Sequence, residues 1–308
     1  EILIGLVGSE MCIRDRYMYE GDLNYLREQQ EYMRALLRVL ASQMDGDREN
    51  LQGGQRLLDW PTSQMPDVIH AGYQALMVMA MEAGAEIGGW LGDRQMQSEC
   101  HGALRRLRRH VPDHLRNKQA AAMLVLAGLA DPGKVCRTVI ARGGAEGFST
   151  FYGYYMLEAL AEGGLYDEAL QIISDYWGAM LDLGATTFWE DLNYAHAAGA
   201  ARIDEPVPAG KFDIHAESGA YCYKGLRHSL CHGWASGPTP WLSRHVLGIV
   251  PLEPGCKSVA VRPHLGHLKW AEGTFPTPWG VIRVRHERGA DGKVSTSVSA
   301  PDGVRVVR

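Results

Sequence analysis

The feature that most constrains this chain is a helical pattern that repeats from residue 17 to about residue 230. Apolar residues recur every three or four positions, the spacing of one buried helix face, most clearly over 26–40, 73–81, 152–160 and 170–181. Glycine–aspartate junctions separate these stretches, at Gly21-Asp22, at Gly92-Asp93 and from Gly164 to Asp167. Glycine allows the left-handed turn that ends one helix, and aspartate can cap the next. The pattern therefore predicts helical hairpins, which bury both of their layers when they close into an α/α toroid.

The pattern changes after about Pro240. Short β-branched runs at 259–262, 281–285 and 304–307 replace the helical spacing, and several alternate apolar with polar residues, as half-buried strands do. Asp291-Gly292 lies between two such runs and is typical of a tight hairpin turn. We therefore predict an α+β multidomain protein, with an α/α toroid over residues 17–240 and a small antiparallel β-sandwich over residues 241–308.

Residues 1–16 differ from everything that follows. Their sequence, EILIGLVGSEMCIRDR, has neither helical nor strand periodicity and joins a well-patterned helix without a turn. The string GSEMCIRDR resembles translated sequencing-adapter read-through. We interpret residues 1–16 as a non-native leader and expect an N-terminally truncated toroid. Coding DNA that reads continuously upstream through this stretch would contradict that interpretation.

Charge and cysteine content exclude several classes of protein. The net charge of −5 argues against a nucleic-acid or membrane-surface protein, and no apolar run approaches the roughly 18–20 residues of a membrane helix. The six cysteines lack zinc-site spacing, so we expect buried free thiols. The 13 tyrosines and 8 tryptophans favour a carbohydrate partner, onto which flat rings can stack. Oligomeric state and localisation stay open, with a cytoplasmic location slightly favoured over secretion.

The first candidate for catalysis is the loop that follows the helix ending near Leu183. It brings Thr187, Trp189 and Glu190 together. A carboxylate beside an indole suits sugar hydrolysis, because the indole can stack on a sugar while the carboxylate activates water. Taken alone, a glutamate in this place is more often a solvated surface residue.

The second candidate is the turn that contains His232 and Trp234. Gly233 lies between them and allows close approach of the backbone, and a neutral histidine can bond to sugar hydroxyls. The alternative is a hinge between two domains that contains a buried structural histidine. A metal site formed by His228, Cys231 and His232 lacks a fourth ligand in the sequence.

Two further segments supply weaker candidates. Asp59 and Trp60 end one segment just before Pro61, so Asp59 could accept a sugar hydroxyl or simply stabilise a turn. Tyr152 belongs to a run of aromatic residues between positions 148 and 155. Side chains at successive positions cannot all face one core, so some of these rings should line a cavity or an interface.

From Tyr17 to the C-terminus, the chain resembles the bacterial α-L-rhamnosidases of glycoside hydrolase family 78. The resemblance rests on several motifs in the family's order. They are Tyr152-Gly153-Tyr154-Tyr155, Tyr176-Trp177-Gly178, the segment from Gly184 to Glu190, His232-Gly233-Trp234, the segment from Leu247 to Gly255, and the segment from Gly273 to Gly280.

The resemblance implies a six-hairpin α/α barrel followed by an all-β domain. It also implies inverting hydrolysis of terminal α-L-rhamnosides, with no metal or other cofactor in the catalytic step. Glu190 matches the general base, and His232 and Trp234 match sugar-contacting residues. Trp189 and, more weakly, Asp59, Trp60 and Tyr152 are the other substrate-binding residues that it implies.

The chain departs from the family's pattern at the general acid. The family's acid lies in an upstream acidic segment, which Arg14-Asp15-Arg16 and Gly21-Asp22 imitate only in part. We assign no general acid, although hydrolysis by this chain alone would make Asp15 and Glu20 candidates.

Two other functions remain open. One is another α/α-toroid carbohydrate enzyme, either a different inverting glycosidase or a polysaccharide lyase, although a lyase site usually needs a cationic groove for uronates. The other is a carbohydrate-binding fragment without catalytic activity.

Overall fold

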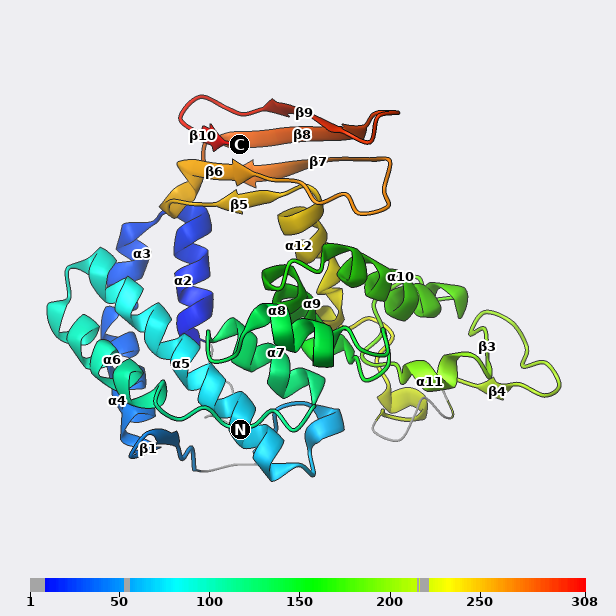
Figure 1. Ribbon diagram of the computed structural model, residues 1–308, viewed down its shortest axis with the longest axis horizontal. Helices are drawn as coiled ribbons and strands as arrows, with labels where there is room; N and C mark the ends of the chain where they lie inside the picture. Colours follow the sequence, from blue (N-terminus) through cyan, green and yellow to red (C-terminus); the bar gives the residue numbers. More distant parts are fainter. Residues whose placement is uncertain (1–8, 53–55, 215, 217–221) are drawn as a thin grey trace. The chain divides into compact units, whose positions relative to one another are not determined.

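The computed structural model describes residues 9–52, 56–214, 216 and 222–308. Helices and small sheets are mixed along the chain, which confirms the predicted α+β composition (Figure 1). The chain divides into two compact units. Unit 1 consists of Glu1–Arg56, His70–Asp113 and Leu242–Arg308, and unit 2 consists of Leu57–Ile69 and His114–Trp241.

The helices of unit 1 cover both of the predicted apolar stretches in this part of the chain, 26–40 and 73–81. They are α2 (Ser9–Glu20), α3 (Leu23–Glu28), α4 (Gln30–Ser42), most of α5 (Pro66–Leu91) and α6 (Arg94–Leu107). The first predicted stripe is buried throughout and comprises Leu26, Met33, Leu36, Leu37 and Leu40. Two predicted junctions are confirmed, since Gly21 and Gly92 have positive φ and the carboxylates of Asp22 and Asp93 accept backbone N–H groups of α3 and α6.

Helix α2 includes residues 9–16 of the predicted leader, whose residues 1–8 lie outside the described part of the chain. Within unit 1, Ile13 is buried and the Arg14 guanidinium lies 2.5 Å from a carboxylate oxygen of Glu86 in α5. The apolar residues of α2 do not gather on one face, which is why periodicity did not predict this helix.

The C-terminal strands of unit 1 form two three-stranded sheets. One has the order β10-β6-β5, from Arg305–Val307, Ser258–Val261 and Ile249–Pro251, and the other has the order β7-β8-β9, from Trp270–Thr277, Gly280–Arg288 and Val294–Ser299. Side chains of both sheets share one hydrophobic cluster that includes Val259, Val261, Ile282 and Val284. The predicted hairpin at Asp291-Gly292 is confirmed, because it joins the antiparallel strands β8 and β9.

One pairing corrects the antiparallel prediction, since β10 runs parallel to β6. The chain reaches β10 only after building the whole β7-β8-β9 sheet, so no tight turn forces the strand to reverse direction. Unit 1 also contains the short antiparallel pair β1 (Met44–Asp45) and β2 (Arg48–Glu49).

Unit 2 is mainly helical. Its helices are α7 (Lys118–Leu126), α8 (Pro132–Val135) with a π-helical turn at Cys136–Ile140, α9 (Thr150–Glu162), α10 (Tyr166–Asp182), α11 (Tyr194–Ala197) and α12 (Pro238–Trp241), and β3 (Ala200–Ala201) pairs in parallel with β4 (Phe212–Asp213). Helix α7 is buried from Gln119 to Val125 and packs against α9. Gly153 lets α9 approach α10 closely, because a Cβ there would lie 2.7 Å from the Trp177 ring.

The third predicted junction needs a correction. Gly164 has positive φ as expected, but the N-cap of α10 is Leu165, which makes no side-chain capping bond. Asp167 lies inside the first turn, too far along the helix to cap it, and can only interact favourably with the helix dipole. Among the described helices of both units, none combines the length and apolar character needed to cross a lipid bilayer.

Candidate active site

Glu190 lies in an irregular segment of unit 2 between α10 and α11. Gly184, with φ of 92°, turns the chain after α10, and the segment then pairs locally with residues 228–232. The Glu190 N–H donates to the Ser229 carbonyl at 2.8 Å, and the His232 N–H donates to the Phe188 carbonyl at 2.8 Å. These two bonds bring the two main candidate segments of the sequence into contact.

Further hydrogen bonds hold Glu190 on both its backbone and its side chain. The Ser229 N–H donates to the carboxylate oxygen Oε2 at 2.9 Å. The Glu190 carbonyl accepts the Trp234 indole N–H at 2.8 Å and the Thr150 hydroxyl. Glu190 is only 6% exposed, and the Ser229 bond orients its carboxylate.

Three rings form a stack beside this glutamate. Trp234 stacks on Phe151 with centroids 5.1 Å apart, and His232 lies 4.1 Å from the Trp234 ring. Phe151 also contacts Tyr152, which is buried, whereas Phe151 itself is 36% exposed. Phe151 is therefore the most exposed ring of this stack, a role that its place in the aromatic run did not identify.

Trp189 occupies a different environment from the stack. It is 1% exposed, and its ring makes an edge contact with His228 at 6.5 Å between centroids. In this structure Trp189 packs as a core side chain.

Asp59 and Trp60 lie in another segment of unit 2. Asp59 caps the 3₁₀ turn Trp60–Thr62, and its buried carboxylate accepts the Ser149 hydroxyl at 2.5 Å, the Trp60 N–H at 2.9 Å and the Gln119 amide at 3.3 Å. Burial raises the pKa of Asp59 even though these donors favour its ionised form. Trp60 points instead toward Tyr223, with ring centroids 5.7 Å apart.

Asp191 is a titratable residue that the sequence did not single out. It is 4% exposed, and burial together with the negative charge of Asp59 raises its pKa to about 7. Its Oδ1 accepts the Leu192 N–H at 2.9 Å and lies 3.4 Å from the Tyr176 hydroxyl. Only its place next to Glu190 could have drawn attention to it, because the sequence does not reveal which carboxylates are buried together.

The structure therefore brings Glu190, His232, Trp234 and Tyr152 together through one connected set of contacts. Asp59 is connected to this set through two neighbouring residues. Ser149 donates to the Asp59 carboxylate, and Thr150 donates to the Glu190 carbonyl. Trp60 and Trp189 make their ring contacts elsewhere in unit 2. No group of three or more metal-ligating side chains occurs in the described ranges, and the His228 imidazole lies against the Asp191 carbonyl at 2.9 Å.

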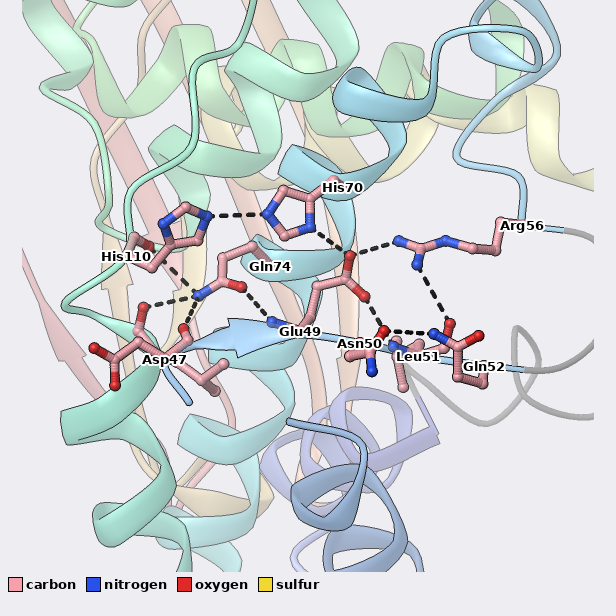
Figure 2. Close-up of polar contacts among 10 residues, drawn as sticks. Asp47, Glu49, Asn50, Leu51, Gln52, Arg56, His70, Gln74 and His110 are labelled. Carbon is pink, nitrogen blue, oxygen red and sulfur yellow. Dashed lines mark hydrogen bonds and ion pairs between the residues drawn. The ribbon is translucent and has the colours of Figure 1, made fainter. Parts of the chain in front are cut away.

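A separate polar cluster occupies unit 1 (Figure 2). The buried Glu49 carboxylate binds His70 Nδ1 at 2.6 Å and the Arg56 guanidinium at 2.5 Å, and His70 Nε2 lies 3.0 Å from His110 Nε2. Burial alone would raise the pKa of Glu49, but hydrogen bonds from His70, the Leu51 N–H and Arg56 lower it below its ordinary value. The bond between Glu49 and His70 connects the β1–β2 hairpin to α5.

The Asp15 and Glu20 carboxylates also lie in unit 1. Each is exposed and forms an ion pair with an arginine of α2, at 3.0 Å to Arg14 and 2.7 Å to Arg16.

Comparison with known proteins identifies the C-terminal domain. The family model of the bacterial alpha-L-rhamnosidase C-terminal domain matches residues 248–307. No curated protein sequence matches the chain at a significant level.

Solved structures extend the similarity to nearly the whole chain. The GH78 family rhamnosidase of Bacillus sp. GL1 aligns with a TM-score of 0.74 and 20% identity, over 96% of this chain and 32% of that protein. An α-L-rhamnosidase of Streptomyces avermitilis, solved with L-rhamnose, aligns with a TM-score of 0.73 and 20% identity. The alignment covers 94% of this chain and 28% of that protein. An α-L-rhamnosidase from Aspergillus terreus aligns with a TM-score of 0.72 and 15% identity, over 98% of this chain and 36% of that protein. The chain thus has the fold of these proteins and spans about a third of their length. The family model and the shared fold confirm the resemblance seen in the motifs.

Proposed function

We propose that this chain is part of a glycoside hydrolase that releases terminal α-L-rhamnose, with Glu190 as the general base. The proposal starts from a C-terminal domain and a fold that are those of α-L-rhamnosidases. The observation that carries it is the environment of Glu190 beside a partly exposed aromatic stack. The Ser229 N–H binds its nearly buried carboxylate, and Thr150 and Trp234 hold its backbone carbonyl.

The geometry suits activation of a water molecule. In inverting hydrolysis, one carboxyl group protonates the leaving oxygen, while a second, roughly 6.5–9.5 Å away, activates water on the opposite face of the sugar. The Ser229 N–H fixes one oxygen of the Glu190 carboxylate, and the other oxygen can receive the proton of the attacking water. His232, Trp234, Tyr152, Asp59, Trp60 and Trp189 remain proposed substrate-binding residues, with no metal or other cofactor in the step.

The same proposal extends to the architecture. We infer that the helical hairpins are part of a six-hairpin α/α toroid and that the two C-terminal sheets form a β-sandwich. The hydrophobic cluster shared by the two sheets supports the second inference.

Release of nitrophenol from an aryl α-L-rhamnoside by the purified protein and by the full-length protein tests the activity. We expect Glu190→Gln to lower kcat by about 10²–10⁴-fold, the usual contribution of a general base, with affinity for L-rhamnose retained. Glu168→Gln, an exposed glutamate in the first turn of α10, is the matched control and should retain full activity.

The outcomes separate the alternatives. Full activity of Glu190→Gln would exclude Glu190 as the base, and initial release of α-rhamnose, seen by proton NMR, would exclude inversion. Rhamnose binding without turnover by the full-length protein would indicate a carbohydrate-binding role instead. Unsaturated, ultraviolet-absorbing products would indicate a lyase.

A further inference from the structure

Two consecutive hydroxyl side chains at the start of α9 bind two segments that are far apart in the chain. The Ser149 hydroxyl donates to Asp59 Oδ2 at 2.5 Å across 90 positions, and the Thr150 hydroxyl donates to the Glu190 carbonyl across 40 positions. All four residues are buried and belong to unit 2. One helical turn therefore contacts both the Asp59 segment and the Glu190 segment.

The use of Ser149 is unusual for its position. Ser149 is the N-cap residue of α9, yet its side chain makes no capping hydrogen bond. The N-cap side chains of α3, α6 and α7 all accept backbone N–H groups of their own helices. A serine at an N-cap ordinarily stabilises its helix in that way. The Ser149 hydroxyl instead donates to the Asp59 carboxylate and leaves the N-terminus of α9 without a side-chain cap.

The contact made by Thr150 is equally specific. The Glu190 segment has no helix or strand of its own between α10 and α11, so its path depends on bonds to other segments. Thr150 and Trp234 both donate to the Glu190 carbonyl, while Ser229 fixes the carboxylate. Among these residues, Thr150 directly follows Ser149, whose hydroxyl donates to the Asp59 carboxylate.

We propose that Ser149 and Thr150 are positioning residues that hold the Asp59 and Glu190 segments in a fixed arrangement relative to each other. The inference rests on the proposed function of Glu190. Displacement of a reacting group by about 1 Å can lower a rate by about 10²-fold, so a rigid first turn of α9 serves catalysis without touching substrate.

Thr150→Val tests the Glu190 side, because valine keeps the shape of threonine and removes only the hydroxyl. The Glu190 carbonyl retains the Trp234 N–H as a donor, so no buried acceptor is left unpaired and the fold should persist. Thr150→Ser keeps the hydroxyl and should rescue the effect. Thr138→Val is the matched control, since the exposed Thr138 hydroxyl bonds to the Lys134 carbonyl of its own helical segment.

Two independent measurements are made on these variants. Hydrogen exchange by mass spectrometry should show peptides covering 186–192 exchanging about tenfold faster in Thr150→Val, as expected for loss of one hydrogen bond, and at the wild-type rate in Thr150→Ser and Thr138→Val. For an aryl α-L-rhamnoside, kcat should fall by about 10–100-fold in Thr150→Val with little change in KM.

Wild-type exchange together with wild-type kcat in Thr150→Val would overturn the proposal. If the full-length wild-type protein hydrolyses no rhamnoside, the proposed function fails, and hydrogen exchange alone still decides whether Thr150 positions the segment. Should Thr150→Val not fold, Ser149→Ala tests the Asp59 side. Faster exchange over residues 57–62 supports the proposal, and unchanged exchange overturns it.

Discussion

At the scale of single residues, the buried carboxyl of Asp191 makes the stability of the fold depend on pH. Burial and the charge of Asp59 raise its pKa to about 7, whereas an unfolded aspartate titrates near about 4. The folded chain therefore holds this proton more tightly than the unfolded chain. The resulting stabilisation is complete below about pH 4 and is lost as the pH rises through about 7.

Asp191→Asn tests this linkage, because asparagine imitates the protonated carboxyl and cannot ionise. We expect the free energy of unfolding of the variant, relative to wild type, to increase from pH 5 to pH 8 by roughly 2.5 kcal/mol, because linkage contributes about 1.4 kcal/mol per pH unit until the folded group ionises near pH 7. Urea unfolding at the two pH values measures the change. A difference between variant and wild type that does not vary with pH would show that Asp191 does not hold the proton.

At the scale of elements, Asp93 joins two helices of unit 1. Its carboxylate caps α6 through the Met96 N–H at 3.1 Å and accepts the Arg34 guanidinium at 2.6 Å and the Gln30 amide at 2.9 Å, both from α4. Burial alone would raise the pKa of Asp93, but these hydrogen bonds outweigh it and lower the pKa to about 2. The cap thus also fixes how α4 packs against α6.

Asp93→Asn separates the charge from the cap, since asparagine is also a good N-cap residue. A lowered carboxyl pKa stabilises the fold above about pH 4, and this contribution is lost as the pH falls through about 2. We therefore expect Asp93→Asn to lose about 2 kcal/mol of stability at pH 7 and progressively less below pH 4. An equal loss at pH 7 and pH 3, measured by denaturant unfolding, would contradict the charge-based account.

At the scale of the whole molecule, the first described helix meets the C-terminal segment at a pair of glycines. A Cβ on Gly21 would lie 2.7 Å from the Gly255 Cα, and Cys256 lies beside the end of α2. Both glycines have positive φ, 71° in each case. This contact joins segments more than 230 positions apart within unit 1 and leaves no room for a side chain.

Gly21→Ala should therefore be more destabilising than Gly92→Ala. Both substitutions place alanine at a φ near +70°, which costs about 1–2 kcal/mol, but nothing lies within 4 Å of a Cβ at Gly92. We expect Gly21→Ala to cost at least about 1 kcal/mol more, because backbone atoms must move to accept the methyl group. Equal changes in thermal unfolding would mean that this contact does not stabilise unit 1.

The sequence by itself determined the local features of this protein. The apolar stripe of α3 and α4, the caps at Asp22 and Asp93 and the hairpin at Asp291-Gly292 depend on interactions within a few residues, so the pattern around each position is sufficient. The motifs were also sufficient for the resemblance to rhamnosidases, which the C-terminal domain and the fold confirm.

The tertiary structure alone decided which distant segments meet. No local pattern distinguishes β10 as a parallel strand, Trp189 as a core ring, or Asp191 as a buried neighbour of Asp59. The bonds from Ser149 to Asp59 and from Thr150 to Glu190 cross 90 and 40 positions of chain. Serine and threonine at a helix start predict only a local cap, and their actual partners depend on how the packed helices bring separate loops together.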